Sequence, residues 1–246
     1  MLIGPDGKPV MNELTEVQKS NMQPGAEGKV TVFTNGIFND EANAGSYAVQ
    51  MSEAPIGDSV YLVYYPEADN PLSELMVAGY QKYLESPELG LSNPTQQTLD
   101  IVDEYGDEGL NLVGHSRGGL TISNALDAKA GQVGSRGSAT DTYVKLVGPA
   151  SNAQETAKNL DHLSDGFSSG VDLQNHDDDF IGRIIGGNPA TYDKRPADSS
   201  KVEEYIRIFD DAPTVHSCYG SGASSFDCIR KYGKAPTMNV QPDLLD

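Results

Sequence analysis

The sequence lacks a long apolar segment and has few basic residues. No run approaches the roughly 18 apolar residues that a membrane-spanning helix needs, so we expect no transmembrane segment. The 17 lysines and arginines are outnumbered by 36 aspartates and glutamates, for a net charge of −19. Such a surface repels nucleic acid and anionic lipid. We therefore expect no nucleic-acid partner and no unaided adsorption to anionic phospholipid.

Cysteine is also scarce, with only Cys218 and Cys228 in the chain. No Cys/His spacing is that of a zinc site, and we expect neither a metal nor a cofactor. The two cysteines form a local disulfide or remain two buried thiols. The redox compartment decides between these alternatives, and the sequence does not reveal it.

Residues 1–28 have no sustained apolar periodicity and are rich in glycine and proline. They predict a leader or linker with one short helix over Asn12–Lys19, followed by the main domain over residues 29–246. The segment Met1–Pro9 lacks the charged and then apolar layout of a secretion signal. We expect the chain to have no signal peptide of its own, so that it stays in the cytoplasm unless another segment exports it.

The rest of the chain predicts strands that alternate with helices. This alternation implies βαβ crossovers, and hence an α/β fold with a mainly parallel sheet and helices on both faces. The length suits one large domain of this class. The expected strands are Val30–Thr34, Val60–Tyr65, Leu110–Val113, Tyr143–Val147 and Gly170–Leu173. The expected helices are Asp40–Ser52, Pro71–Leu84, Asn93–Tyr105, Gly119–Leu126, Ala153–Leu163 and Ser224–Tyr232, with Lys201–Phe209 either helix or strand and residues 186–200 a loop.

The most informative motif is Gly114–Gly118, which has the pattern G-x-S-x-G of a nucleophile elbow. The apolar run Leu110–Val113 before it predicts a buried strand, and Gly119–Leu126 after it predicts a helix. Strand, tight turn and helix are the context that this motif requires. The alternative is a glycine-rich turn that binds a phosphate or nothing, but it would not explain the central serine. Ser116 is therefore the candidate nucleophile.

A serine nucleophile needs a base, and in the α/β-hydrolase order the acid and then the histidine follow the serine. Of the four histidines, His216 lies in the loop Pro213–Gly220, after the last strand candidate. It is the candidate base, with a purely structural histidine as the alternative. His115 lies inside the elbow and is expected to pack beside the turn. His162 is expected at the surface of a helix, and His176 precedes the acidic loop and so comes too early in the chain.

The orienting acid is expected on the loop after a late strand, where Asp177, Asp178 and Asp179 are adjacent. Three neighbouring aspartates cannot all face one histidine. Asp179 is the first choice, because the Phe180–Ile181 pair that follows lets the chain turn inward directly after the carboxylate. Asp178 is the second choice. The alternatives are a solvated acidic turn or a calcium loop, although the regular spacing of further oxygen ligands that calcium requires is missing.

The oxyanion hole of such a site takes one amide from the residue after the nucleophile, here Arg117. The second amide comes from the loop after an early strand, which predicts Gly36 or Ile37 as the donor. Glycine permits the close backbone approach that this role needs. Asn35 either adds a side-chain donor or ends the strand as an ordinary turn residue.

These motifs together resemble a known family. Thr34–Asn39, Tyr64–Pro66, the elbow, the aspartate-rich loop and the pair His216–Ser217 are similar to α/β-hydrolase domains over residues 29–232. More narrowly, they resemble the C-terminal toxin domains of bacterial polymorphic toxins, which are carried on filamentous-haemagglutinin-like or contact-dependent inhibition proteins. Only two strands precede the elbow strand, so the resemblance implies a reduced version of the fold without the usual first hairpin.

The resemblance implies a lipase- or esterase-like antibacterial effector, delivered as the C-terminal domain of a secreted toxin and neutralised by a cognate immunity protein. A lipid or phospholipid acyl ester is the substrate it implies. Apolar residues near the strand ends either line an acyl pocket or belong to the core. The alternatives are an esterase or thioesterase acting on soluble substrates, and a non-catalytic binding module on the same fold. The apolar pairs in question are Ile37–Phe38, Tyr64–Tyr65 and Phe180–Ile181.

Overall fold

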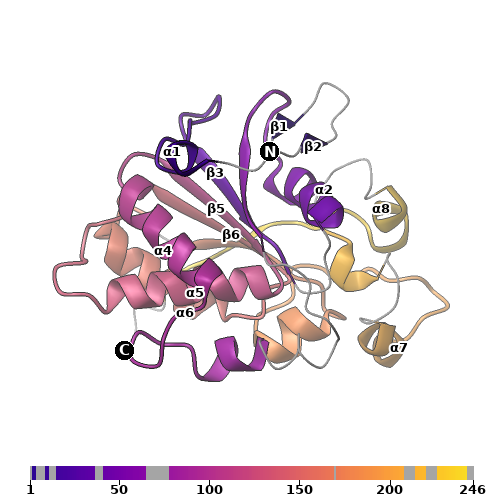
Figure 1. The fold of residues 1–246 in the computed structure, drawn as a ribbon. Helices are drawn as coiled ribbons and strands as arrows, with labels where there is room; N and C mark the ends of the chain where they lie inside the picture. Colours follow the sequence, from indigo (N-terminus) through magenta and orange to yellow (C-terminus); the bar gives the residue numbers. More distant parts are fainter. Residues whose placement is uncertain are drawn as a thin grey trace.

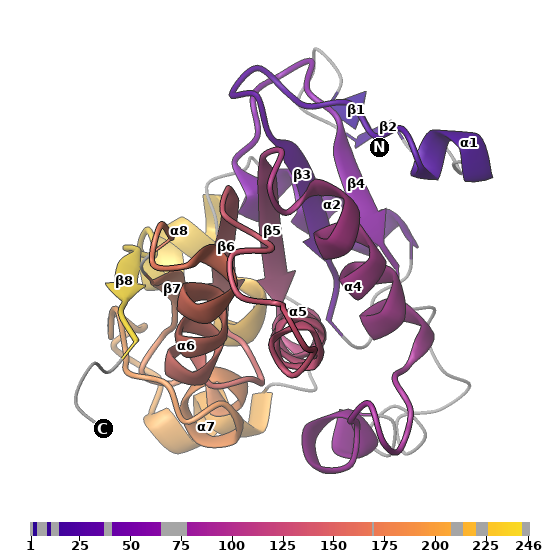
Figure 2. The same ribbon diagram turned by 90° about the vertical axis from the view of Figure 1, so that its left-hand side faces the viewer.

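Six strands form the central sheet of the computed structural model, which describes residues 2–3, 9–10, 15–36, 41–64, 78–168, 170–207, 214–219 and 226–242. Their order across the sheet is β4-β3-β5-β6-β7-β8 (Figures 1 and 2). The first five are parallel to their neighbours, and β8 is antiparallel to β7. The mainly parallel sheet expected from the sequence is therefore confirmed. The bounds are β3 (Val30–Thr34), β4 (Val60–Val63), β5 (Leu110–His115), β6 (Thr142–Val147), β7 (Val171–Gln174) and β8 (Met238–Val240).

Helices cover both faces of this sheet. Figure 1 shows α4, α5 and α6 on one side and α2 on the other, and Figure 2 places the first three in front of the strands. The bounds are α2 (Glu41–Ser52), α4 (Asn93–Tyr105), α5 (Arg117–Ala130), α6 (Ala153–Ser164), α7 (Lys201–Ile206) and α8 (Phe226–Tyr232). Two shorter helical segments, η1 (Ile181–Ile185) and η3 (Val215–Ser217), follow β7 and α7 in the chain.

Strand alternation explains the two cores, because successive side chains of a strand point to opposite faces. On β5, Leu112 packs in the core beneath α4, α5 and α6, and its neighbour Val113 packs in the core beneath α2. Val32 and Phe33 of β3 divide in the same way. Burial on both faces explains why these strands are near-continuous apolar runs in the sequence.

The described residues before residue 29 form short elements and contribute to the core, unlike the leader or linker expected from the sequence. β1 (Leu2–Ile3) and β2 (Pro9–Val10) form a small antiparallel pair that is separate from the central sheet, and α1 spans Glu16–Lys19. Within the described residues, no strand before β3 joins the central sheet. Met22 is buried in the core beneath α4 and α5, and its amide donates a hydrogen bond of 2.9 Å to the Tyr105 hydroxyl. The chain thus packs against the sheet domain before residue 29.

Several expected elements take a more definite form in the structure. Lys201–Ile206 is a helix, capped by the Ser200 hydroxyl and by Glu203. The helix at residue 93 is preceded by Ser92 as its N-cap. Most of the expected helix Pro71–Leu84 lies outside the described residues, and its described part is helical from residue 78 to 83. No described helix is both long enough and apolar enough to cross a bilayer.

Candidate active site

The candidate site lies at the edge of the sheet where the parallel strands end. The chain runs from β3 outward to β4 and then returns to β5 on the other side of β3. Such a reversal leaves a crevice at the carboxyl ends of the two central strands, where α/β proteins bind their ligands. Gly36 follows β3 and Ser116 follows β5 at this point. A Cβ at Gly36 would lie 2.8 Å from the Ser116 Cβ, so the two residues are in direct contact.

Ser116 has the strained backbone that a nucleophile elbow requires. Its φ of 57° and ψ of −122° lie in a region that a residue with a side chain rarely adopts. The turn is held by two backbone hydrogen bonds: the Ser116 amide donates to Val147 O (3.1 Å), and the Ala150 amide donates to Ser116 O (3.0 Å). The structure thereby gives the sequence motif its strand, its strained turn and its helix.

Close backbone packing explains the glycines around this serine. A Cβ at Gly118 would collide with the backbone of Thr34 on β3, and one at Gly119 would lie 2.7 Å from the Pro149 Cβ. Gly114 and Gly119 are themselves in contact across the elbow, where a Cβ on Gly114 would lie 2.7 Å from the Gly119 Cα. The glycines therefore let α5 pack tightly between the ends of β3 and β6.

The three adjacent aspartates have three different partners. Asp177 pairs with Lys201 at 2.6 Å and with Arg183 at 3.3 Å. Asp178 is 1 % exposed and receives two hydrogen bonds, of 2.7 and 2.8 Å, from one guanidinium nitrogen of Arg195. Their carboxylates are therefore engaged in ion pairs. Asp179 alone of the three turns toward His216, which answers the choice that the sequence left between Asp178 and Asp179 as its partner.

Asp179 is fully buried and binds His216 directly. The His216 Nδ1 lies 2.8 Å from Asp179 Oδ2 and 3.0 Å from Oδ1. The amides of Ile181 and Gly182 donate to Oδ1 at 2.9 and 3.2 Å, and the Tyr219 hydroxyl donates to Oδ2. Burial by itself raises the pKa of this carboxyl, but His216 and the hydrogen-bond donors outweigh burial and hold the pKa below its usual value. Asp179 is thus an ionised hydrogen-bond acceptor.

His115 helps to fix the segment that carries His216. The two rings lie 4.8 Å apart between centroids, and His115 Nε2 is 2.9 Å from the His216 carbonyl oxygen. Burial, followed by the proximity of His216, lowers the pKa of His115 to about 3, so its ring is neutral. A ring nitrogen that faces a carbonyl oxygen must carry the proton, so Nε2–H is the donor. His115 packs beside the turn, as expected, and also holds the backbone of His216.

No hydrogen bond between Ser116 Oγ and His216 is present among the residues that the structure describes. The two residues are nonetheless joined through their neighbours, because His115 contacts His216 and immediately precedes Ser116. Catalytic hydrogen bonds of this kind are often long without substrate and tighten when it binds. The structure therefore pairs Asp179 with His216 and connects Ser116 to this pair through its neighbour His115.

The structure describes two of the predicted oxyanion donors, Arg117 and Gly36. Arg117 opens α5 directly after Ser116, and Gly36 contacts the Ser116 side chain, where a Cβ would lie 3.4 Å from Oγ. Both backbones are therefore close to the place where an oxyanion would form. Asn35 is buried, and its amide nitrogen donates to Gly36 O at 2.9 Å, so it shapes this turn. Ile37, the remaining candidate, lies outside the described residues.

The other two histidines have structural partners. His162 is half-buried and its Nε2 lies 3.2 Å from the Ser135 hydroxyl, so it is less exposed than the sequence suggested. His176 is fully buried, with Nε2 2.7 Å from Lys194 O and Nδ1 accepting from the Asp178 amide at 2.9 Å. Neither contacts the Asp179–His216 pair through its side chain in the described structure.

Two residues that contact Asp179, Gly148 and Tyr219, were not predicted from the sequence. Gly148 follows β6 with φ +47°, and a Cβ there would lie 2.5 Å from Asp179 Oδ2 and 3.2 Å from His216 Nδ1. The sequence offered one signal for it, since a glycine directly after a buried strand often marks close backbone approach. Tyr219 gave no signal, because nothing local shows that its hydroxyl reaches Asp179.

Cys218 and Cys228 form a disulfide, which resolves the alternative that the sequence left open. The bond ties the segment of His216 to α8, and both cysteines are buried against Val215 and Tyr232. A crosslink over so short a loop stabilises the fold by about 3 kcal/mol in the chain-entropy account. The disulfide therefore anchors the histidine segment to α8.

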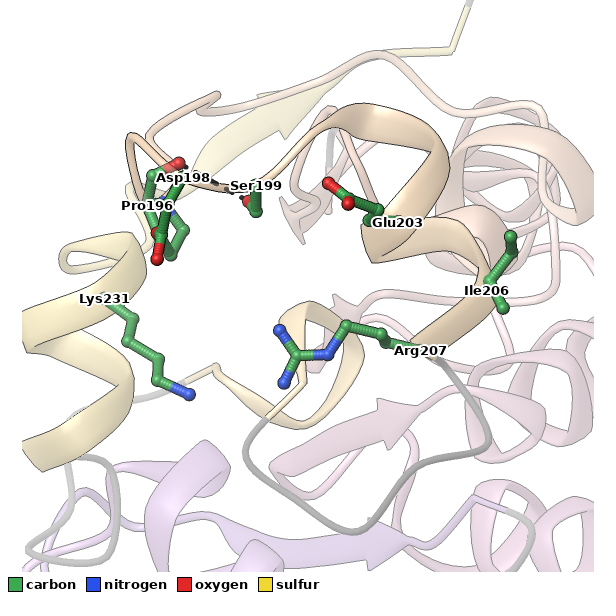
Figure 3. Close-up of a pocket in the computed structure, with 7 residues that line it drawn as sticks. All are labelled: Pro196, Asp198, Ser199, Glu203, Ile206, Arg207 and Lys231. Carbon is green, nitrogen blue, oxygen red and sulfur yellow. Dashed lines mark hydrogen bonds between the residues drawn. The ribbon is translucent and has the colours of Figure 1, made fainter.

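Two cavities of the described structure lie away from this site. One of about 440 Å³ lies between α7, α8 and the turn at Pro196 (Figure 3). Neither it nor a second cavity of about 300 Å³ beside Gln174 is lined by the predicted catalytic residues. Of the expected acyl-pocket residues, Ile37, Phe38 and Tyr65 lie outside the described residues. The Phe180 ring packs against Tyr205, with centroids 5.6 Å apart.

Comparison of the chain with protein-family models, with curated proteins and with solved structures finds no match. Among the described residues, no group of three or more histidine, cysteine, aspartate or glutamate side chains is arranged to hold a metal ion. The geometry of the site itself is therefore the basis for inferring a function.

Proposed function

We propose that this protein is a serine hydrolase of the α/β-hydrolase type that cleaves an ester bond, with Ser116 as nucleophile, His216 as base and Asp179 as orienting acid. One observation carries the proposal: the buried Asp179 carboxylate is paired with His216 at the sheet edge where a strained serine follows β5. The order of serine, aspartate and histidine along the chain also supports it.

The roles of the residues follow from their contacts. His216 Nδ1 faces a carboxylate and so carries the proton, which leaves Nε2 as the basic nitrogen. Nε2 accepts the proton of Ser116 as its Oγ attacks the ester carbonyl, and then gives it to the leaving alcohol. The amides of Arg117 and of Gly36 or Ile37 stabilise the oxyanion. Water, activated by the same base, then releases the acid from the acyl-enzyme.

A fluorophosphonate probe tests the proposal directly, because it forms a covalent bond only with an activated serine. We expect stoichiometric labelling that peptide mass spectrometry assigns to Ser116. Ser116→Ala should remain unlabelled. Ser123→Ala, which removes a hydroxyl from the same helix far from the elbow, should label like the wild type. Folded wild-type protein that takes up no probe would instead support a binding module.

The motifs that resemble polymorphic-toxin domains support a lipid acyl ester as the substrate and an antibacterial role with a cognate immunity protein. We expect the chain to arrest growth when it is expressed in bacteria and directed to the compartment that holds its substrate. Free fatty acids should rise at the same time, and Ser116→Ala should abolish both effects. Hydrolysis of short soluble esters or thioesters without a change in cellular lipids would assign the soluble-substrate alternative.

A further inference from the structure

Tyr219 contacts Asp179 on the side of the carboxylate that His216 shares, although the proposed mechanism assigns it no role. Its hydroxyl donates a hydrogen bond to Asp179 Oδ2 and accepts one from the His176 amide at 3.1 Å. The hydroxyl thus lies between the loop after β7 and the candidate triad. Because an amide can only donate, the hydroxyl must accept from His176, and its own proton must therefore point to Asp179.

The phenol is buried in a way that keeps it protonated. The Tyr219 side chain is 0 % exposed. Burial, followed by the negative charge of Asp179, raises the pKa of its hydroxyl well above its usual value. The group is therefore a neutral donor toward a charged acceptor. Hydrogen bonds of this type are among the stronger ones in proteins.

The backbone of Tyr219 is held as firmly as its hydroxyl. Gln50 of α2 donates from its side chain to Tyr219 O at 2.6 Å. The preceding residue, Cys218, is joined to Cys228 by the disulfide, and its carbonyl accepts from the Tyr192 hydroxyl at 3.3 Å. These anchors fix the ring, so the hydroxyl can hold the carboxylate in place.

We propose that Tyr219 is a positioning residue that orients the Asp179 carboxylate toward His216. The inference rests on the proposed function. The amides of Ile181 and Gly182 hold Oδ1, and Tyr219 holds Oδ2 opposite to them. With both oxygens held, both of them point toward His216 Nδ1. Without the hydroxyl, Oδ2 keeps His216 as its only donor among the described residues.

The hydrogen bond from the Tyr219 hydroxyl also stabilises the negative charge of Asp179. Removing it concentrates that charge on His216, and the pair then binds a proton more tightly. His115 on β5 and Tyr192 in the loop after β7 are titratable groups that interact with this pair, and both enter any pH profile. Tyr47 on α2 packs against His115, and His176 packs against Tyr192.

Tyr219→Phe tests this role, with Tyr105→Phe as the matched control. Tyr105 is a second buried tyrosine, but it lies in the core on the other face of the sheet, where its hydroxyl accepts a hydrogen bond from the Met22 amide. For Tyr219→Phe we expect kcat for ester hydrolysis to fall about 10- to 100-fold, the range of one hydrogen bond to a charged group, with KM unchanged. The acid limb of the kcat/KM profile should move to higher pH. Tyr105→Phe should change neither.

Two measurements separate a positioning role from a loss of folding. Thermal unfolding reports stability, and the exchangeable proton between His216 and Asp179 reports their hydrogen bond by proton NMR without any need for activity. We expect Tyr219→Phe to remain folded and to shift that resonance. An active wild type with an unchanged kcat, pH profile and resonance in Tyr219→Phe would overturn the role of Tyr219 alone. A wild type that neither hydrolyses esters nor labels at Ser116 would overturn the proposed function.

Discussion

Replacing Asp179 with asparagine is expected to lower kcat/KM for ester hydrolysis by about 10⁴-fold, the loss typical of an orienting aspartate in a serine triad. The asparagine retains the shape of the side chain but has no charge with which to stabilise the imidazolium. It also turns an NH2 group toward a nitrogen, and His216 then adopts the wrong tautomer. Steady-state kinetics on a short ester, with unfolding curves for each protein, provide the measurement.

The neighbouring aspartates provide matched controls for this substitution. Asp178→Asn removes the buried carboxylate from an ion pair with the exposed Arg195 and should cost about 2 kcal/mol of unfolding free energy while leaving kcat largely intact. Asp177→Asn loses the more exposed pairs with Lys201 and Arg183, and its effect on stability should stay below about 1 kcal/mol. If Asp178→Asn abolished activity while Asp179→Asn did not, our assignment of the acid would be wrong.

The parts of this molecule that local sequence determines were predicted well. A strand, a glycine-flanked serine and a helix are consecutive in the chain, so the elbow is visible without any tertiary information. The parallel sheet follows from the alternation of apolar strands with helices of matching length. β8 was missed because Met238–Val240 is short and mostly exposed, so it has neither an apolar run nor a clear alternation.

Contacts between distant segments explain the other misses. Asp179 was preferred because Phe180 and Ile181 follow it, but what binds its carboxylate in the structure is the backbone amides of Ile181 and Gly182, which the sequence argument did not use. The reason that Asp178 faces elsewhere is Arg195, which lies 17 residues away and which no local pattern identifies. Tyr219 lies 40 residues from Asp179, and only the fold brings the two together.

Substitution of Gly148 is expected to have the second large effect on activity. We expect Gly148→Ala to lower kcat/KM at least about 100-fold, because displacement of catalytic groups by even about 1 Å is this costly. The new Cβ would lie 2.5 Å from Asp179 Oδ2, 2.9 Å from Tyr219 Cε2 and 3.2 Å from His216 Nδ1. None of these groups can move freely, since each is buried or hydrogen-bonded on its other side. The carboxylate must therefore shift relative to the imidazole.

Backbone strain has to be separated from this displacement, because Gly148 also has a positive φ of +47°. Gly134→Ala is the control: its φ is +80°, and a Cβ there would meet nothing within 4 Å. Both variants should lose about 1–2 kcal/mol of stability from the left-handed backbone, but only Gly148→Ala should lose activity in protein that is still folded. Equal kcat/KM values for the two folded variants would show that the space beside Gly148 is not needed to align Asp179 with His216.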